Sequence, residues 1–68
     1  MNKKLFKAIL VKNGDTQKEL AAALGISLSN LNAKINSTGA SFRQTEILAI
    51  KTRYHMTADE VDAIFFAS

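Results

Sequence analysis

The chain has 68 residues, no cysteine, no proline and a formal net charge of +3. A chain of this length is expected to form one domain with a small core, here over residues 1–68, and the lack of cysteine excludes disulfides and thiolate metal sites. Its hydrophobic content of 47% is too high for a disordered chain. Together these features favour an all-helical domain, and the absence of cysteine fits a reducing compartment such as the cytoplasm.

The charges are unevenly distributed along the chain. Residues 1–43 contain seven basic and two acidic residues, a balance of +5, whereas residues 44–68 contain two basic and four acidic ones, a balance of −2. The basic first part is suited to a polyanionic partner, although a merely solvated basic surface fits the same count.

The first predicted helix covers residues 3–13 and ends at Asn13-Gly14. Lys7 and Lys12 interrupt its run of apolar residues, which argues against a signal peptide. No apolar stretch of the sequence is long enough to span a membrane. The apolar side chains expected on its inner face are Leu5, Phe6, Ile9 and Leu10.

Two further helices are predicted in close succession. One begins near Asp15-Thr16, where Thr16 and Glu19 form a capping-box pattern, and ends at Gly25. The next covers residues 27–36, with Ser27 as its N-cap. Only about three residues separate the two helices, so they are expected to cross sharply, as in a helix-turn-helix.

The second half of the chain predicts two more helices after a loop at Asn36-Ser37-Thr38-Gly39. The fourth starts around residues 41–43 and reaches about His55; the fifth starts at the capping box Thr57 to Glu60. Phe66 lies roughly 140° around that helix from Val61. It is therefore expected to be an exposed dimer contact, unless it folds back onto its own domain. The expected core positions of the two helices are Ile47, Ile50, Tyr54, Val61, Ile64 and Phe65.

Residues 17–36, QKELAAALGISLSNLNAKIN, meet the packing requirements of a helix-turn-helix. Ala21 is the small residue at the crossing and Gly25 forms the turn. The last apolar position of the pattern holds Lys34, and Ile35 is expected to supply the packing instead. The apolar positions that are filled are Leu20, Leu24, Ile26 and Leu31.

This segment, TQKELAAALGIS followed by a polar helix, resembles the Xre-type helix-turn-helix domain of phage repressors and Cro proteins. LNAKIN, the F-x-x-x-EI of Phe42 to Ile47 and MTADEVDAIFF are similar to short Cro-like regulators from prophages of Gram-positive bacteria. The resemblance covers nearly the whole chain and implies an all-α, five-helix, lambda-repressor-like (Xre-type) helix-turn-helix domain. It implies a transcriptional repressor that binds double-stranded operator DNA through its third helix. The Phe66 contact and the spacing of two DNA half-sites predict a homodimer at least on DNA.

The resemblance also assigns roles to residues. It implies that Gln17 contacts a DNA phosphate and that Asn36 and Arg43 contact the DNA backbone. The residues implied to contact bases are Leu28, Ser29, Asn32 and Ala33. Ser27 belongs to the same predicted DNA-binding set. A solvated face is the alternative for Ser29 and Asn32, but the short neutral side chains of this helix favour DNA contact. Leu28 could instead lie at the edge of the core and not against a thymine methyl. Ser37 stands where relatives commonly have glycine, and Leu28 and Ala33 replace the polar base readers of many relatives.

No enzyme, cofactor, metal or small-molecule ligand is expected. The sequence has no Gly-rich phosphate loop or catalytic triad, and Asp59, Glu60 and Asp62 stand where they cap a helix. Two other functions remain compatible with the sequence. One is an antitoxin-like or adaptor helix-turn-helix protein whose main partner is a protein. The other is a small basic nucleoid- or RNA-binding module without sequence preference.

Overall fold

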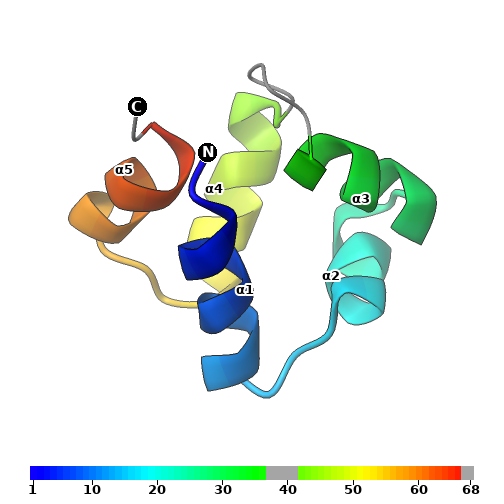
Figure 1. Ribbon diagram of the computed structural model, residues 1–68, viewed down its shortest axis with the longest axis horizontal. Coiled ribbons are helices and arrows are strands. Elements are labelled where there is room, and N and C mark those ends of the chain that lie inside the picture. Colours follow the sequence, from blue (N-terminus) through cyan, green and yellow to red (C-terminus); the bar gives the residue numbers. More distant parts are fainter. Residues whose placement is uncertain (37–41, 67–68) are drawn as a thin grey trace.

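The computed structural model describes residues 1–36 and 42–66, which form five α-helices and no strand. In Figure 1, α2 and α3 form one side of the molecule, α5 forms the opposite side, and α1 and α4 lie between them. None of the described helices is long and apolar enough to cross a membrane. The helices are α1 (Lys3–Lys12), α2 (Gln17–Leu24), α3 (Leu28–Asn36), α4 (Gln44–Arg53) and α5 (Ala58–Phe65).

The all-helical, five-helix prediction is confirmed. The fourth helix starts at Gln44 and ends at Arg53, so it is shorter at both ends than predicted. The loop predicted at Ser37, Thr38 and Gly39 lies outside the described residues.

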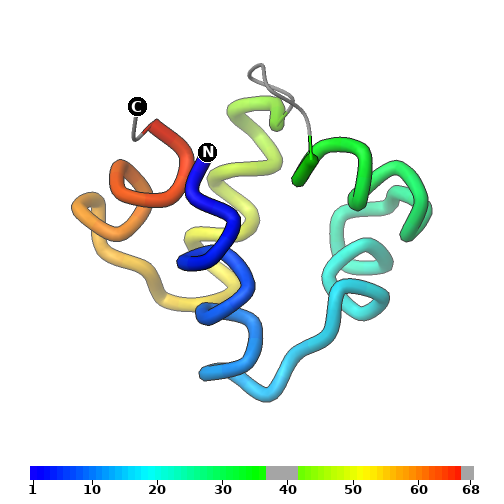
Figure 2. The backbone as a smooth tube through the Cα atoms, viewed as in Figure 1, coloured from blue at the N-terminus to red at the C-terminus, as the bar shows by residue number. Residues whose placement is uncertain are grey.

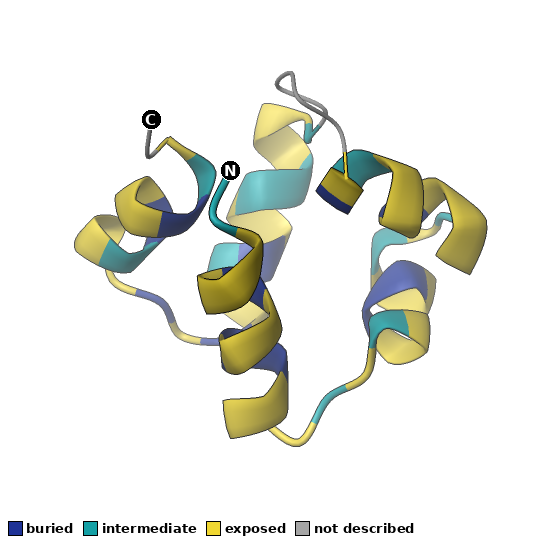
Figure 3. Ribbon diagram, in the orientation of Figure 1, coloured by how far each residue is buried: buried dark blue, intermediate teal, exposed yellow. Residues whose placement is uncertain are grey.

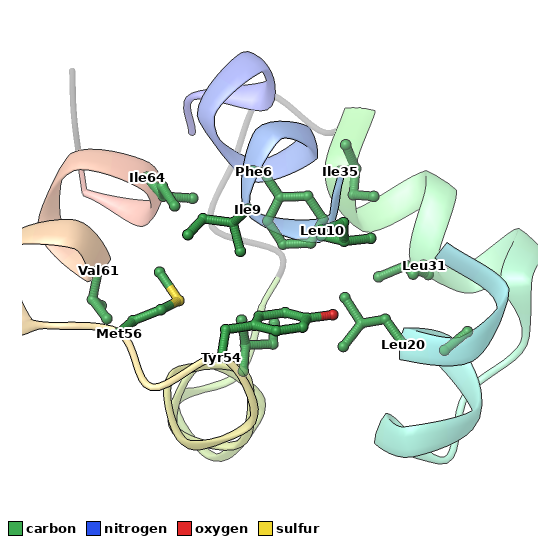
Figure 4. Packing of buried hydrophobic residues seen from close by; sticks show 12 residues of the cluster. Phe6, Ile9, Leu10, Leu20, Leu31, Ile35, Tyr54, Met56, Val61 and Ile64 are labelled. Atoms are coloured by element: carbon green, nitrogen blue, oxygen red, sulfur yellow. The ribbon is translucent and has the colours of Figure 1, made fainter. Parts of the chain in front are cut away.

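All five helices, and the residues that end α4, contribute to one buried cluster (Figure 4). Ile35 is buried and supplies the packing that Lys34 cannot, as predicted. The prediction that Leu5 lies on the inner face of α1 is wrong, because its side chain is 42% exposed. The buried residues are Phe6, Ile9, Leu10, Leu20, Ala21, Leu31, Ile35, Ile50, Tyr54, Met56, Val61 and Ile64.

The helices α1, α2 and α4 end in the same way. In each, the residue after the last turn has a positive φ: Gly14 at +65°, Gly25 at +72° and His55 at +50°. The next backbone N–H then bonds back to a carbonyl five residues earlier, which is the Schellman arrangement. These bonds are Asp15 N to Leu10 O at 2.9 Å, Ile26 N to Ala21 O at 3.0 Å and Met56 N to Lys51 O at 2.9 Å.

The two predicted capping boxes differ in outcome. At α5 the box is complete, since Thr57 Oγ1 accepts from the Glu60 N–H at 3.1 Å and Glu60 Oε1 accepts from the Thr57 N–H at 2.8 Å. At α2 only half of it forms. Thr16 Oγ1 accepts from the Glu19 N–H at 3.1 Å. The Thr16 N–H, however, donates to Asp15 Oδ1 at 3.1 Å, so Asp15 takes the place predicted for the Glu19 carboxylate.

The two ends of the described chain meet beside α5. The backbone N–H of Asn2 donates to the carbonyl of Ile64 at 2.7 Å, and Figure 2 shows α1 starting next to the end of α5. Three phenylalanine rings pack against one another in the same region. Their centroids are 5.8 Å apart for Phe6 and Phe42, 6.1 Å for Phe6 and Phe65, and 5.4 Å for Phe42 and Phe65. These edge and tilted contacts are the arrangement that aromatic quadrupoles favour.

Candidate nucleic-acid interface

The residues expected to pack α2 and α3 together are buried or partly buried. Ala21 is buried, and Gly25 after α2 adopts the left-handed conformation. Leu20 and Leu31 are fully buried beneath the pair, while Leu24 and Ile26 are partly buried against the same core. The outer surface of α3 is therefore supported by a packed layer directly below it.

Figure 3 shows that one face of α3 is exposed, and the residues on this face have short, uncharged side chains. Leu31 and Ile35 occupy the opposite, buried face. Leu28 is 42% exposed at the margin between the two faces, so it does not lie in the core. The residues that share the exposed face, at the i, i+3, i+4 and i+7 spacing of a helix, are Ser29, Asn32, Ala33 and Asn36.

Hydrogen bonding divides the polar side chains of α3 into two groups. Ser27 is the N-cap, and its Oγ accepts from the Asn30 N–H at 3.0 Å. Asn36 Nδ2 donates to the backbone carbonyl of Asn32 at 2.9 Å. Within residues 1–36 and 42–66, by contrast, the side chains of Ser29 and Asn32 find no hydrogen-bond partner. These two side chains are exposed and able to bond to another molecule.

Lys34, which the sequence marks only as a departure from the apolar pattern, joins α3 to α4. Its Nζ lies 3.1 Å from Oε1 of Glu46 and 5.9 Å from the centroid of the Phe42 ring. The same Glu46 oxygen accepts from the Arg43 N–H at 2.8 Å. Burial disfavours the ionised Glu46, but the Arg43 N–H and the Lys34 ammonium outweigh it, and the pKa of Glu46 falls below its usual value. Sequence reasoning missed this ion pair because its partners are distant in sequence and follow no local pattern.

The other predicted site residues do not belong to α3. Gln17 is the first residue of α2 and is half-buried, while Arg43 is the exposed N-cap of α4. Figure 1 shows the end of α3 close to the start of α4, the helix that follows Arg43. Phe66 lies at the end of α5, on the other side of the molecule from α3.

Phe66 borders a second surface, the α4–α5 hollow. This hollow has a volume of about 490 Å³ and includes Leu48 and Lys51 in its lining. Leu48 is 58% exposed and Phe66 is 65% exposed, so Phe66 does not fold back onto its own domain. The exposure predicted for Phe66 is confirmed, and its role as a dimer contact stays a prediction.

The sequence has no acidic residue between Glu19 and Glu46, and Glu46 is paired with Lys34. Acidic and histidine side chains form no group able to hold a metal ion within the part of the chain that the structure describes.

Comparison with protein-family models, with curated proteins and with solved structures finds no match to this chain.

Proposed function

We propose that the protein is a sequence-specific DNA-binding regulator of transcription, a Cro-like repressor with a lambda-repressor-like helix-turn-helix formed by α2 and α3. The observation that carries the proposal is the exposed face of α3. Ser29 and Asn32 there present hydrogen-bonding groups without charge, on a helix whose other face is buried in the core. A recognition helix needs this combination, because its side chains must reach base edges while the domain holds its backbone in place.

The charge of the chain supplies the affinity that such a surface needs. Residues 1–43 have a balance of +5, and no acidic residue lies between Glu19 and Glu46 to repel phosphates. Gln17 at the start of α2 and Arg43 at the start of α4 are placed at helix N-termini, where phosphate contacts are favoured. Occupation of an operator by the protein would then block a promoter without any catalysis.

The α4–α5 hollow supports a homodimer on DNA. Its exposed Phe66 follows α5, the helix on the opposite side of the molecule from α3, so a second copy could dock there without covering the DNA-binding face. A two-fold dimer also matches two half-sites about 34 Å apart. The same apolar surface favours the alternative function, an antitoxin-like or adaptor protein that binds another protein.

The test is a titration of selected and random duplexes at several salt concentrations. If about four to six phosphates are neutralised per subunit, the affinity falls with a log–log slope of roughly −0.9 per phosphate. Ser29→Ala and Asn32→Ala should cost about 1–3 kcal/mol on the selected duplex and little on random DNA. Gln17→Ala should weaken both alike, because a phosphate contact carries no sequence information.

Two outcomes would contradict the proposal. One is affinity for every duplex that is absent or independent of salt. The other is an unchanged ratio of selected to random affinity in Ser29→Ala and Asn32→Ala, which would show that α3 is not the reader. Leu31→Ala is the folding control: removal of this fully buried side chain should cost about 2–5 kcal/mol of unfolding free energy. The base-contact variants should melt like the wild type.

A further inference from the structure

The chemistry of the α3 face specifies more than DNA binding in general. We infer that α3 selects A·T base pairs, with thymine methyl groups packed against Leu28 and Ala33 and adenine held by Asn32. The inference rests on the proposed DNA-binding function and adds the class of sequence that the protein recognises. Three observations carry it.

The first observation is apolar surface on the exposed part of α3. Leu28 is 42% exposed in the first turn of α3, and the methyl group of Ala33 lies on the exposed face. Exposed apolar area gains free energy only if something apolar covers it. In the major groove the apolar group on offer is the 5-methyl of thymine.

The second observation is the amide of Asn32. It is exposed on the same face and has no hydrogen-bond partner among the described residues. A carboxamide carries one acceptor and one donor group side by side, which match the N6 amino group and the N7 acceptor of adenine. Ser29, a turn earlier, can bond to the edge of any base, so it contributes to the specific contact without favouring A·T over G·C.

The third observation is that readers for a G·C pair are missing from this face. Guanine is read mainly by Arg or Lys, and cytosine by a carboxylate. Lys34 is the one basic residue of α3, and its side chain is 14% exposed and paired with Glu46 on the side that faces α4. The helix contains no Asp or Glu. Both members of a G·C pair therefore lack their usual partners here.

The test starts from duplexes enriched from a random pool by the full-length protein. We expect A·T-rich half-sites. Thymines of an enriched duplex are then replaced by deoxyuridine, which lacks the 5-methyl group but keeps the Watson–Crick edge. The affinity of the wild type should fall about fourfold for each contacted methyl group, the value of one buried methylene. In a second arm, adenines are replaced by 7-deazaadenine, which lacks the N7 acceptor of the Asn32 contact.

Matched variants separate the contact from general effects. Leu28→Ala should lose much of the sensitivity to deoxyuridine, and Asn32→Ala the sensitivity to 7-deazaadenine. Leu5→Ala is the control for Leu28→Ala, because Leu5 is also 42% exposed in the first turn of a helix but lies on α1. It should keep the full sensitivity of the wild type.

The outcomes distinguish this inference from the proposed function. If no sequence is enriched, both are overturned. If G·C-rich sites are enriched, or A·T-rich sites bind equally well with deoxyuridine and 7-deazaadenine, the protein is a specific DNA-binding protein but the inference is wrong. The same conclusion follows if Leu28→Ala and Asn32→Ala keep the sensitivities of the wild type.

Discussion

The hydroxyl of Tyr54 donates a 2.6 Å hydrogen bond to Oδ2 of Asp15, a residue 39 positions earlier in the chain. Arg53 Nε donates to the same oxygen at 2.8 Å. These bonds join the connection between α1 and α2 to the end of α4, so they hold α2 against the rest of the core. The Arg53 guanidinium and then the Tyr54 hydroxyl keep the pKa of Asp15 well below its usual value.

The bond also predicts the titration of Tyr54. Burial, together with the bond to the Asp15 carboxylate, favours the neutral phenol and raises the pKa of Tyr54 to about 12. Tyr54 is the only tyrosine and the chain has no tryptophan, so phenolate absorbance reports this group alone. We expect a titration midpoint near 12 in the folded protein and a lower one in Asp15→Asn. Circular dichroism of the same samples monitors folding, and a wild-type midpoint near the ordinary value of about 10 would contradict the assignment.

Acid should destabilise the protein through Asp15. The pKa of Asp15 is lower in the folded than in the unfolded chain. Its carboxylate therefore stabilises the fold above the unfolded-state value of about 4, and this contribution is lost as the pH falls toward the folded-state value. Urea unfolding between about pH 6 and pH 2 should show a declining free energy for the wild type. Asp15→Asn should be less stable at pH 6 and decline less on acidification; parallel declines would show that Asp15 does not contribute.

His55 is the residue at which a substitution should stabilise the fold. Its φ of +50° lies in the left-handed region, where a side chain costs free energy and glycine does not. His55→Gly should raise the free energy of unfolding by roughly 0.5–1 kcal/mol, measured by urea or thermal unfolding.

Gly14→Ala is the opposite test of the same physics. Gly14 has a φ of +65°, and an added Cβ would meet no atom within 4 Å. Any loss must therefore come from the backbone conformation, at about 1 kcal/mol. A loss of stability in His55→Gly, or no loss in Gly14→Ala, would contradict the argument.

Leu48 and Phe66 should determine self-association. Truncation of either exposed side chain removes apolar area from the α4–α5 hollow, so Leu48→Ala and Phe66→Ala should weaken the proposed dimer, measured by sedimentation equilibrium with and without an enriched duplex. Val11→Ala, which truncates an exposed apolar residue of α1, is the control and should leave assembly unchanged. A wild-type protein that is monomeric both free and on DNA would refute the dimer.

Local patterns in the sequence predicted the helices and their order. The spacing of Phe6, Ile9 and Leu10 identified the buried face of α1, but periodicity does not fix the width of a face, and Leu5 was wrongly included. The end of α4 was placed too late because His55 takes a conformation that glycine usually signals.

Contacts between distant residues could not be predicted in the same way. The Lys34–Glu46 pair and the Tyr54–Asp15 bond depend on how the helices pack, and no spacing rule reports that. Asp15 shows the effect on local structure as well. It bonds to Thr16 as well as to Tyr54 and Arg53, and so displaces Glu19 from the predicted capping box. The α3 face was predictable because its residues follow a helical period, while the pairing of Lys34 beside it was not.

The three-ring contact of Phe6, Phe42 and Phe65 has a consequence for the order in which the chain folds. The α2–α3 pair is formed by neighbours in sequence and requires the closure of only a short loop. The rings come from the first helix, the segment just before the fourth and the end of the fifth, so they can meet only after most of the chain has been brought together. Substitutions in these rings should therefore act mainly on the rate of unfolding, whereas those in the α2–α3 turn should act on the rate of folding.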